Sequence, residues 1–143
     1  MSLFTDFFSS IVPRKQTGKP EVIYLSGDST YETDIVGEVN HQDTLEGLCR
    51  ARLPGGVYQF ETARLVVSDR VDSNKNAVRV EVRGRLVGYL SVADTIRYRR
   101  YLNAKGKSAA HGQCQAVIKG GWISSDGRHG PFFVALDLPA LVP

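Results

Sequence analysis

The chain has 143 residues, of which 42% are hydrophobic and 23% charged, a composition typical of one globular domain with its own core. No stretch approaches the roughly 18 consecutive apolar residues that a membrane span requires, so we expect no integral membrane segment. The two cysteines, Cys49 and Cys114, are far apart and form no CxxC pair, which excludes a disulfide framework.

The net charge of +3 is distributed unevenly along the chain. Residues 1–69 carry 6 basic and 10 acidic residues (−4), residues 70–107 carry 10 and 3 (+7), and residues 108–143 carry 2 and 2. Clustered arginine and lysine are typical of a phosphate-binding surface, although a merely solvated surface has the same composition. The central stretch is therefore where we expect an anionic partner to bind.

The apolar residues at positions 2–12 recur at the spacing of one helix face, which predicts a short amphipathic helix that ends at Pro13. A helix of about 11 residues is not stable alone in water, so it must dock on its own domain, on a partner protein or on a membrane surface. The start has no basic residue before its apolar part and contains Asp6, so we expect no signal peptide and a cytoplasmic protein. We divide the chain into an N-terminal helix and linker, residues 1–20, and a domain, residues 21–143.

The first half of this domain predicts two short strands, at residues 22–25 and 35–39. The motif Asn40-x-x-Asp43 has the form of a helix N-cap, and the helix should run to about residue 52, before Pro54-Gly55-Gly56. A further strand is predicted over residues 58–68.

A hairpin is predicted in the centre of the chain. Val78, Val80 and Val82 alternate with charged residues, which is the pattern of a half-buried strand. Arg83-Gly84 is typical of a tight turn, and a second strand should follow over residues 86–90. The all-polar loop at residues 72–76 leads into this hairpin and can present hydrogen-bonding groups to a ligand.

A capping box at Ser91-x-x-Asp94 predicts a helix that reaches about residue 104. Two tyrosines of this region, Tyr98 and Tyr101, are interleaved with basic residues, which are Arg97, Arg99, Arg100, Lys105 and Lys107. Cations with aromatic rings suit nucleic acid, through phosphate contacts and base stacking, but tyrosines also fill cores and we expect Tyr101 to do so.

Two last strands are predicted over residues 113–123 and 132–138. The total is six or seven short strands and two or three helices, which favours a mainly β protein, a small β-barrel that carries helices.

No enzyme motif is present: the chain has no Walker loop, no GxSxG and no HExxH. We therefore expect no catalytic residues and no cofactor. The histidines and cysteines do not have the spacing of a zinc module, so we expect no metal site and two free, buried or half-buried thiols.

The segment KNAVRVEVRGRLVGYL resembles the core of the HIRAN domain family, which typically shows Asn-Pro-x-Asp-x-Asn-Ala, a strand, a short turn and a Val-Gly-x-Leu strand. Asn76-Ala77-Val78 and Val87-Gly88-Tyr89-Leu90 carry the match, and the order of elements extends it from about Ile35 to Gly121. The resemblance implies a compact OB- or SH3-like barrel without the ATP-driven motor that often accompanies this domain.

Family members that are better understood bind the 3′ end of single-stranded DNA. Their pocket uses an arginine and aromatic residues after the opening strand, where this chain has Val39, Asn40 and His41, and a tyrosine and an aspartate in the polar loop, where it has Ser73 and Asn74. The residues that the resemblance and the charge pattern assign to nucleic acid are Asn40, His41, Asn74, Lys75, Asn76, Tyr89, Arg97, Arg99 and Arg100.

Two functions follow from this sequence. The first is a non-enzymatic module that binds nucleic acid, either single-stranded DNA or a DNA 3′ end. The second is an adaptor or inhibitor that binds a protein of a DNA-processing or defence system through the N-terminal helix.

Overall fold

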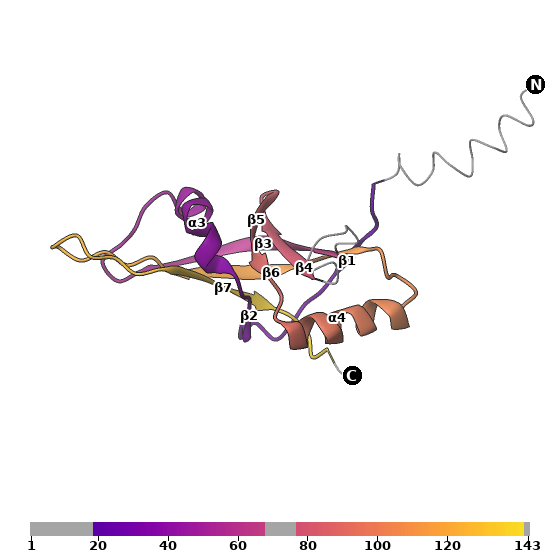
Figure 1. The fold of residues 1–143 in the computed structure, drawn as a ribbon. Helices are drawn as coiled ribbons and strands as arrows, with labels where there is room; N and C mark the ends of the chain where they lie inside the picture. The colour runs from indigo at the N-terminus through magenta and orange to yellow at the C-terminus, as the bar shows by residue number, and fades with distance from the viewer. Residues whose placement is uncertain (1–18, 68–76, 142–143) are drawn as a thin grey trace, which may run out of the picture.

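The computed structural model describes residues 19–67 and 77–141, and both the predicted N-terminal helix and the polar loop at 72–76 lie outside these residues. The described chain is mainly β, with seven strands, two α-helices and one 3-10 helix (Figure 1). The strands are β1 (Val22–Tyr24), β2 (Thr33–Asp34), β3 (Val57–Val67), β4 (Val78–Val82), β5 (Arg85–Tyr89), β6 (His111–Gly120) and β7 (Phe132–Asp137). The helices are η1 (Glu38–His41), α3 (Gln42–Cys49) and α4 (Val92–Ala104).

The strands form one sheet in the order β2-β7-β6-β3-β4-β5, with β1 parallel to the first residues of β6. The residues that follow β2 join the two edges of this sheet. The Ile35 N–H donates to Val134 O on β7 at 3.2 Å, and Val36 and Tyr89 of β5 exchange two backbone hydrogen bonds of 2.8 Å. The sheet therefore curls into a barrel-like structure, as the sequence predicts.

The predicted central hairpin is confirmed. Val78, Val80 and Val82 are fully buried, while the side chains of Arg79 and Glu81 point outward. At the turn, Arg83 and Gly84 have φ angles of 52° and 77°, the left-handed pair that a two-residue hairpin of this hand requires. Burial of the valines in the centre of the barrel anchors the hairpin in the core.

The capping box before α4 is also confirmed, because the Ser91 hydroxyl accepts the Asp94 N–H at 3.1 Å. The helix packs on the barrel through Tyr98 and Leu102, which are fully buried or nearly so, whereas Tyr101 is only half-buried beside the core. The expectation that Tyr101 fills the core is therefore met only in part: Tyr101 packs against the edge of the core, and Tyr98, one turn earlier on the same side of the helix, is the tyrosine that is fully buried.

The start of the first helix differs from the prediction. Gly37 has a left-handed φ of 85°, which ends the extended segment after Val36 and starts the 3-10 helix η1. The predicted strand at 35–39 is therefore wrong in its position: the strand is β2 at Thr33–Asp34, and Val36 forms only an isolated bridge to Tyr89. Asn40 lies inside η1 rather than at the N-cap of α3. The helix also ends earlier than residue 52, because Arg50 takes a left-handed φ of 71° and its N–H bonds to Glu46 O.

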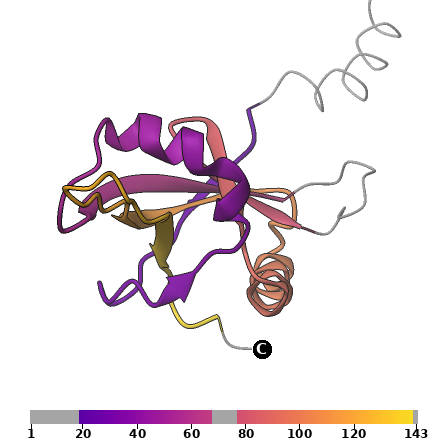
Figure 2. The ribbon, with the colours of Figure 1, turned by 60° about the vertical axis from the view of Figure 1, so that its left-hand side comes forward.

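Residues 53–60 and 117–133 extend beyond the rest of the barrel as a flattened hairpin layer, which we call the arm (Figure 1). The helix α3 lies over one face of the arm, and no helix of the described chain covers the opposite face (Figure 2). The base of the arm is held by Arg52, whose guanidinium donates to Gly130 O and lies 4.6 Å from the centre of the Phe132 ring. No helix among the described residues is long and apolar enough to cross a bilayer.

Candidate nucleic-acid interface

The Val87-Gly88-Tyr89-Leu90 motif lies where the closing segment crosses β5. A Cβ atom on Gly88 would lie 2.6 Å from Val36 O and 2.8 Å from the Ile35 Cδ1 atom. No side chain fits there, so the glycine permits the close backbone approach that joins the two edges of the sheet. The motif thus has a structural role at the closure, and the closure sets the position of Tyr89.

An apolar groove of about 400 Å³ runs between Tyr89 and the first turns of α4. It is lined by Val36, Ala77, Tyr89, Leu90, Val92, Thr95 and Ile96. The side chains of Val92 and Ile96 are 80% and 49% exposed, so this apolar surface is open to a ligand. Ala77 is the first described residue after the polar loop, and the predicted site residues Asn74, Lys75 and Asn76 lie outside the described residues.

Asn40 and His41 lie on η1, which is adjacent to β5, but neither side chain lines the groove beside Tyr89. Gly37, the residue before η1, approaches Tyr89 closely, and a Cβ atom on it would lie 3.4 Å from the Tyr89 ring. A second groove of about 370 Å³ lies between η1 and β7, and it is lined by Ile35, Val36, Gly37, Glu38, Val39, Gln42, Pro131, Phe132 and Phe133. Val36 belongs to both grooves.

The three predicted arginines of α4 have different environments. Arg97 is exposed and forms an ion pair of 3.0 Å with Asp94, so part of its charge is already neutralised. Arg99 is half-buried, and its Nη1 is buried without a hydrogen-bond partner among the described residues, so this predicted site residue is less accessible to a phosphate than an exposed arginine is. Arg100 is exposed and forms no ion pair with a described residue, so it is the best placed of the three to meet a phosphate.

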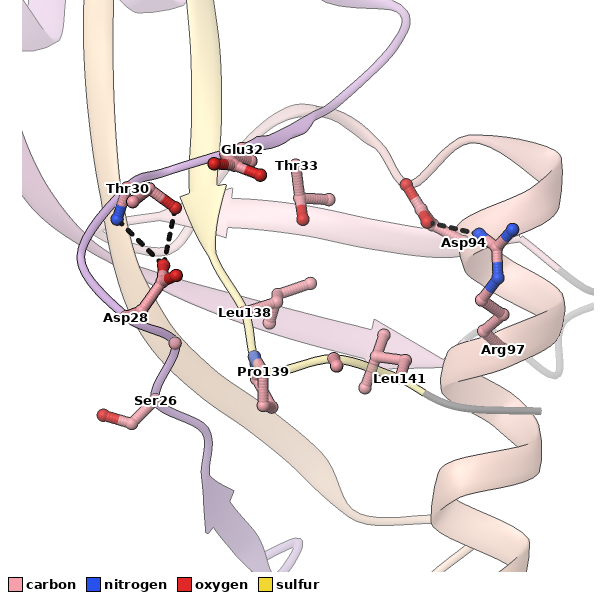
Figure 3. Close-up of a pocket in the computed structure, with 12 residues that line it drawn as sticks. Ser26, Asp28, Thr30, Glu32, Thr33, Asp94, Arg97, Leu138, Pro139 and Leu141 are labelled. Atoms are coloured by element: carbon pink, nitrogen blue, oxygen red, sulfur yellow. Dashed lines mark hydrogen bonds and ion pairs between the residues drawn. The ribbon is translucent and has the colours of Figure 1, made fainter.

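A third hollow, of about 700 Å³, lies on the other side of the start of α4 (Figure 3). Its lining has three carboxylates, Asp28, Glu32 and Asp94, against the single guanidinium of Arg97. Asp28 accepts the hydroxyl and the N–H of Thr30, and the hydroxyl hydrogen bond is the main reason that the pKa of Asp28 is lowered. Three carboxylates against one guanidinium repel phosphate, so this hollow does not suit nucleic acid.

Sequence reasoning missed a group of exposed aromatic side chains on the uncovered face of the arm. Tyr58, Phe60 and Phe133 are 63%, 57% and 50% exposed. The Phe60 ring lies 5.4 Å from the Tyr58 ring and 5.5 Å from the Tyr31 ring. The sequence signal is the alternation of Tyr58 and Phe60 with Gln59 and Glu61, which normally predicts that the aromatic face is buried.

The described residues contain no group of three metal-ligating side chains. Both cysteines are free, with Cys49 half-buried and Cys114 buried. Burial, with a smaller effect of the Asp137 carboxylate, raises the pKa of Cys114 to about 12, so this thiol is neither a nucleophile nor a metal ligand at neutral pH.

No protein-family model, no curated protein and no solved structure matches this sequence or this structure.

Proposed function

We propose that this protein is a non-enzymatic module that binds single-stranded nucleic acid, as the HIRAN domains that its central hairpin resembles do. The observation that carries the proposal is the open apolar groove beside Tyr89, which lies at the Val-Gly-x-Leu strand and against a helix that carries arginines. In this proposal the barrel is of the OB-like kind.

The chemistry of the groove supports a planar, partly apolar ligand. The exposed side chains of Val92 and Ile96 offer apolar contacts, and Tyr89 offers an aromatic ring on which a base can stack. Stacking on an aromatic ring contributes roughly 1–3 kcal/mol per base and does not depend on sequence. Such a groove accepts an unpaired nucleotide, whereas the bases of a duplex are stacked on each other and unavailable to it.

The phosphate contacts are expected from Arg100, and the salt dependence of binding reports them. The logarithm of the affinity should fall with the logarithm of the salt concentration, with a slope of roughly −0.7 per neutralised phosphate of a single strand. The alanine variant Arg100→Ala should reduce this slope. Arg128→Ala is the matched control, because Arg128 pairs with Asp126 in the turn at the tip of the arm, at the opposite end of the molecule from α4 (Figure 1).

The groove itself is tested by a pair of substitutions at Ile96, which is 49% exposed and therefore tolerant of polar side chains. Ile96→Glu places a negative charge in the groove and should abolish binding of a labelled single-stranded oligonucleotide at low salt. Ile96→Gln has nearly the same size without the charge and should weaken binding less. If the wild-type protein binds no single strand at low salt, the proposal is wrong.

A second measurement addresses the end of the strand. Oligonucleotides with free and with phosphorylated 3′ ends should differ in affinity if the groove reads a 3′ end. Equal affinity would leave general single-strand binding and reject end recognition.

A further inference from the structure

The outward side chains on five neighbouring segments of the barrel form one continuous row. In the register of the sheet, Tyr58 is opposite Lys119 and Lys119 is opposite Phe133. Asp34 is paired with Ala135 in antiparallel register, so two residues further along each segment Val36 lies beside Phe133. Both of these side chains line the groove between η1 and β7. Val36 is in turn paired with Tyr89. We call the five residues Tyr89, Val36, Phe133, Lys119 and Tyr58 the outer row.

The outer row connects the groove beside Tyr89 to the aromatic face of the arm. Its apolar members after Tyr89, namely Val36, Phe133 and Tyr58, are 46%, 50% and 63% exposed, and Phe60 and Tyr31 adjoin its far end. Neighbouring strands are about 4.8 Å apart, so four steps span roughly 19 Å. This is the length of about five or six nucleotides at the stacked spacing of 3.4 Å.

The charges along the outer row favour an anion. Lys119 lies between two aromatic side chains, Tyr58 and Phe133, and forms no ion pair with a described residue. Two acids on β7 and η1 are held by backbone groups outside the row: Asp137 accepts the Ser29 N–H at 2.8 Å and Glu38 accepts the Val134 N–H at 3.1 Å. Asp34, beside Ala135, is the exposed acid closest to the row in the sheet register.

We propose that the outer row is an extended track for single-stranded nucleic acid, on which a strand that leaves the Tyr89 groove stacks its bases on Phe133 and Tyr58 and places a phosphate at Lys119. This inference rests on the proposed function and specifies the length and path of the ligand. Proteins that bind single-stranded nucleic acid combine aromatic rings, which stack on the bases, with cations, which contact the phosphates. The exposed rings are otherwise unexplained, because the core lies on the opposite face of the same strands.

The test compares long and short labelled oligothymidines, of about 10 and about 3 nucleotides, because single-strand sites on such barrels cover roughly 4–16 nucleotides. The variants are Tyr58→Ala and Phe133→Ala. The matched control is Tyr24→Ala, which removes another exposed tyrosine, on β1 and outside the outer row. Each variant should lose roughly 5- to 150-fold in affinity for the long oligonucleotide, with affinity for the short one unchanged, from about 1–3 kcal/mol per stacked base. The control should bind both like wild type.

Three results would overturn the inference, and they separate it from the proposed function. If wild type binds neither length, the proposed function fails and the track fails with it. If wild type binds both lengths equally and the two variants bind like wild type, the groove binds the ligand but the track does not exist. If wild type sediments as a dimer that Phe133→Ala dissociates while DNA binding is unchanged, the outer row is an interface between two copies of the chain.

Discussion

The two faces of the arm differ in the burial of their aromatic side chains. On the inner face, Phe132 is fully buried beneath Arg52 and next to α3, and polar side chains fasten the strands to that helix. On the outer face, Phe133 is 50% exposed, together with the rings of Tyr58 and Phe60. None of these three outer rings belongs to the buried core, and exposed aromatic groups of this kind are typical of the binding surface that we propose.

The largest predicted effect is a difference in stability between alanine variants of two adjacent residues of β7 that lie on opposite faces. Phe132→Ala leaves a cavity in the core and should lower the free energy of unfolding by about 3–5 kcal/mol. Phe133→Ala removes an exposed ring and should change it by about 0.5 kcal/mol or less. Denaturant unfolding of the two variants measures the difference. Similar losses would mean that the outer face also belongs to the core.

A smaller loss of stability is expected when the side-chain hydrogen bonds on the inner face are removed. The Gln42 side chain donates to Glu38 O and to Phe132 O and accepts the Phe132 N–H at 2.8 Å, so it joins α3 to β7. Gln42→Ala leaves these backbone groups without a partner and should destabilise the fold by about 1–3 kcal/mol. Gln115→Ala is the control, because Gln115 is exposed on the outer face and donates only a 3.4 Å bond to Thr62. If both variants melt alike, Gln42 does not hold the two elements together.

On the outer face, Lys119→Gln should leave stability within about 0.5 kcal/mol of wild type. It removes one phosphate contact, so the slope of log affinity against log salt for a long single strand should become less steep by roughly 0.7. Titrations at several salt concentrations measure the slope. An unchanged slope would show that the strand does not pass Lys119.

The smallest effect concerns His111 on β6. Burial, and to a lesser degree the Arg64 guanidinium, lower the pKa of His111 below its ordinary value of 6.5, while Glu81 opposes this shift. The unfolded chain therefore binds the proton more readily than the folded protein does, so His111 makes the fold lose stability as the pH falls below about 6.5. In His111→Gln this loss should be shallower between pH 7 and pH 5. Melting curves across that range check it, and a parallel pH dependence in both proteins would contradict it.

The sequence predicts the strands better than the surfaces. The alternation of Val78, Val80 and Val82 identifies a strand and its buried face correctly, because a face that enters a core must be apolar throughout. The capping box at Ser91 is equally local, since its donor and acceptor are three residues apart.

The candidate site depends on interactions that are distant in sequence, and these could not be predicted. The outer row joins residues from position 36 to position 133 through the register of the sheet, which no local pattern encodes. The alternation at Tyr58 and Phe60 suggests the wrong face, because Gln59 reaches the Leu48 carbonyl and thus occupies the side that faces α3. The left-handed turn at Gly37 also has no signal beyond the glycine itself, so the position of Asn40 could not be foreseen.

The seam between Val36 and Tyr89 has a consequence for dynamics. Only two backbone hydrogen bonds join these residues, whereas β3 and β6 are paired along nine residues of each strand. Local opening of a barrel begins where the fewest bonds must break, so the amide hydrogens of Val36 and Tyr89 should exchange with solvent before those of β3. Single-stranded nucleic acid bound across the side chains of Val36 and Tyr89 would stabilise this seam against opening. Slower exchange of these two amide hydrogens would then report that the site is occupied, without any label on the ligand.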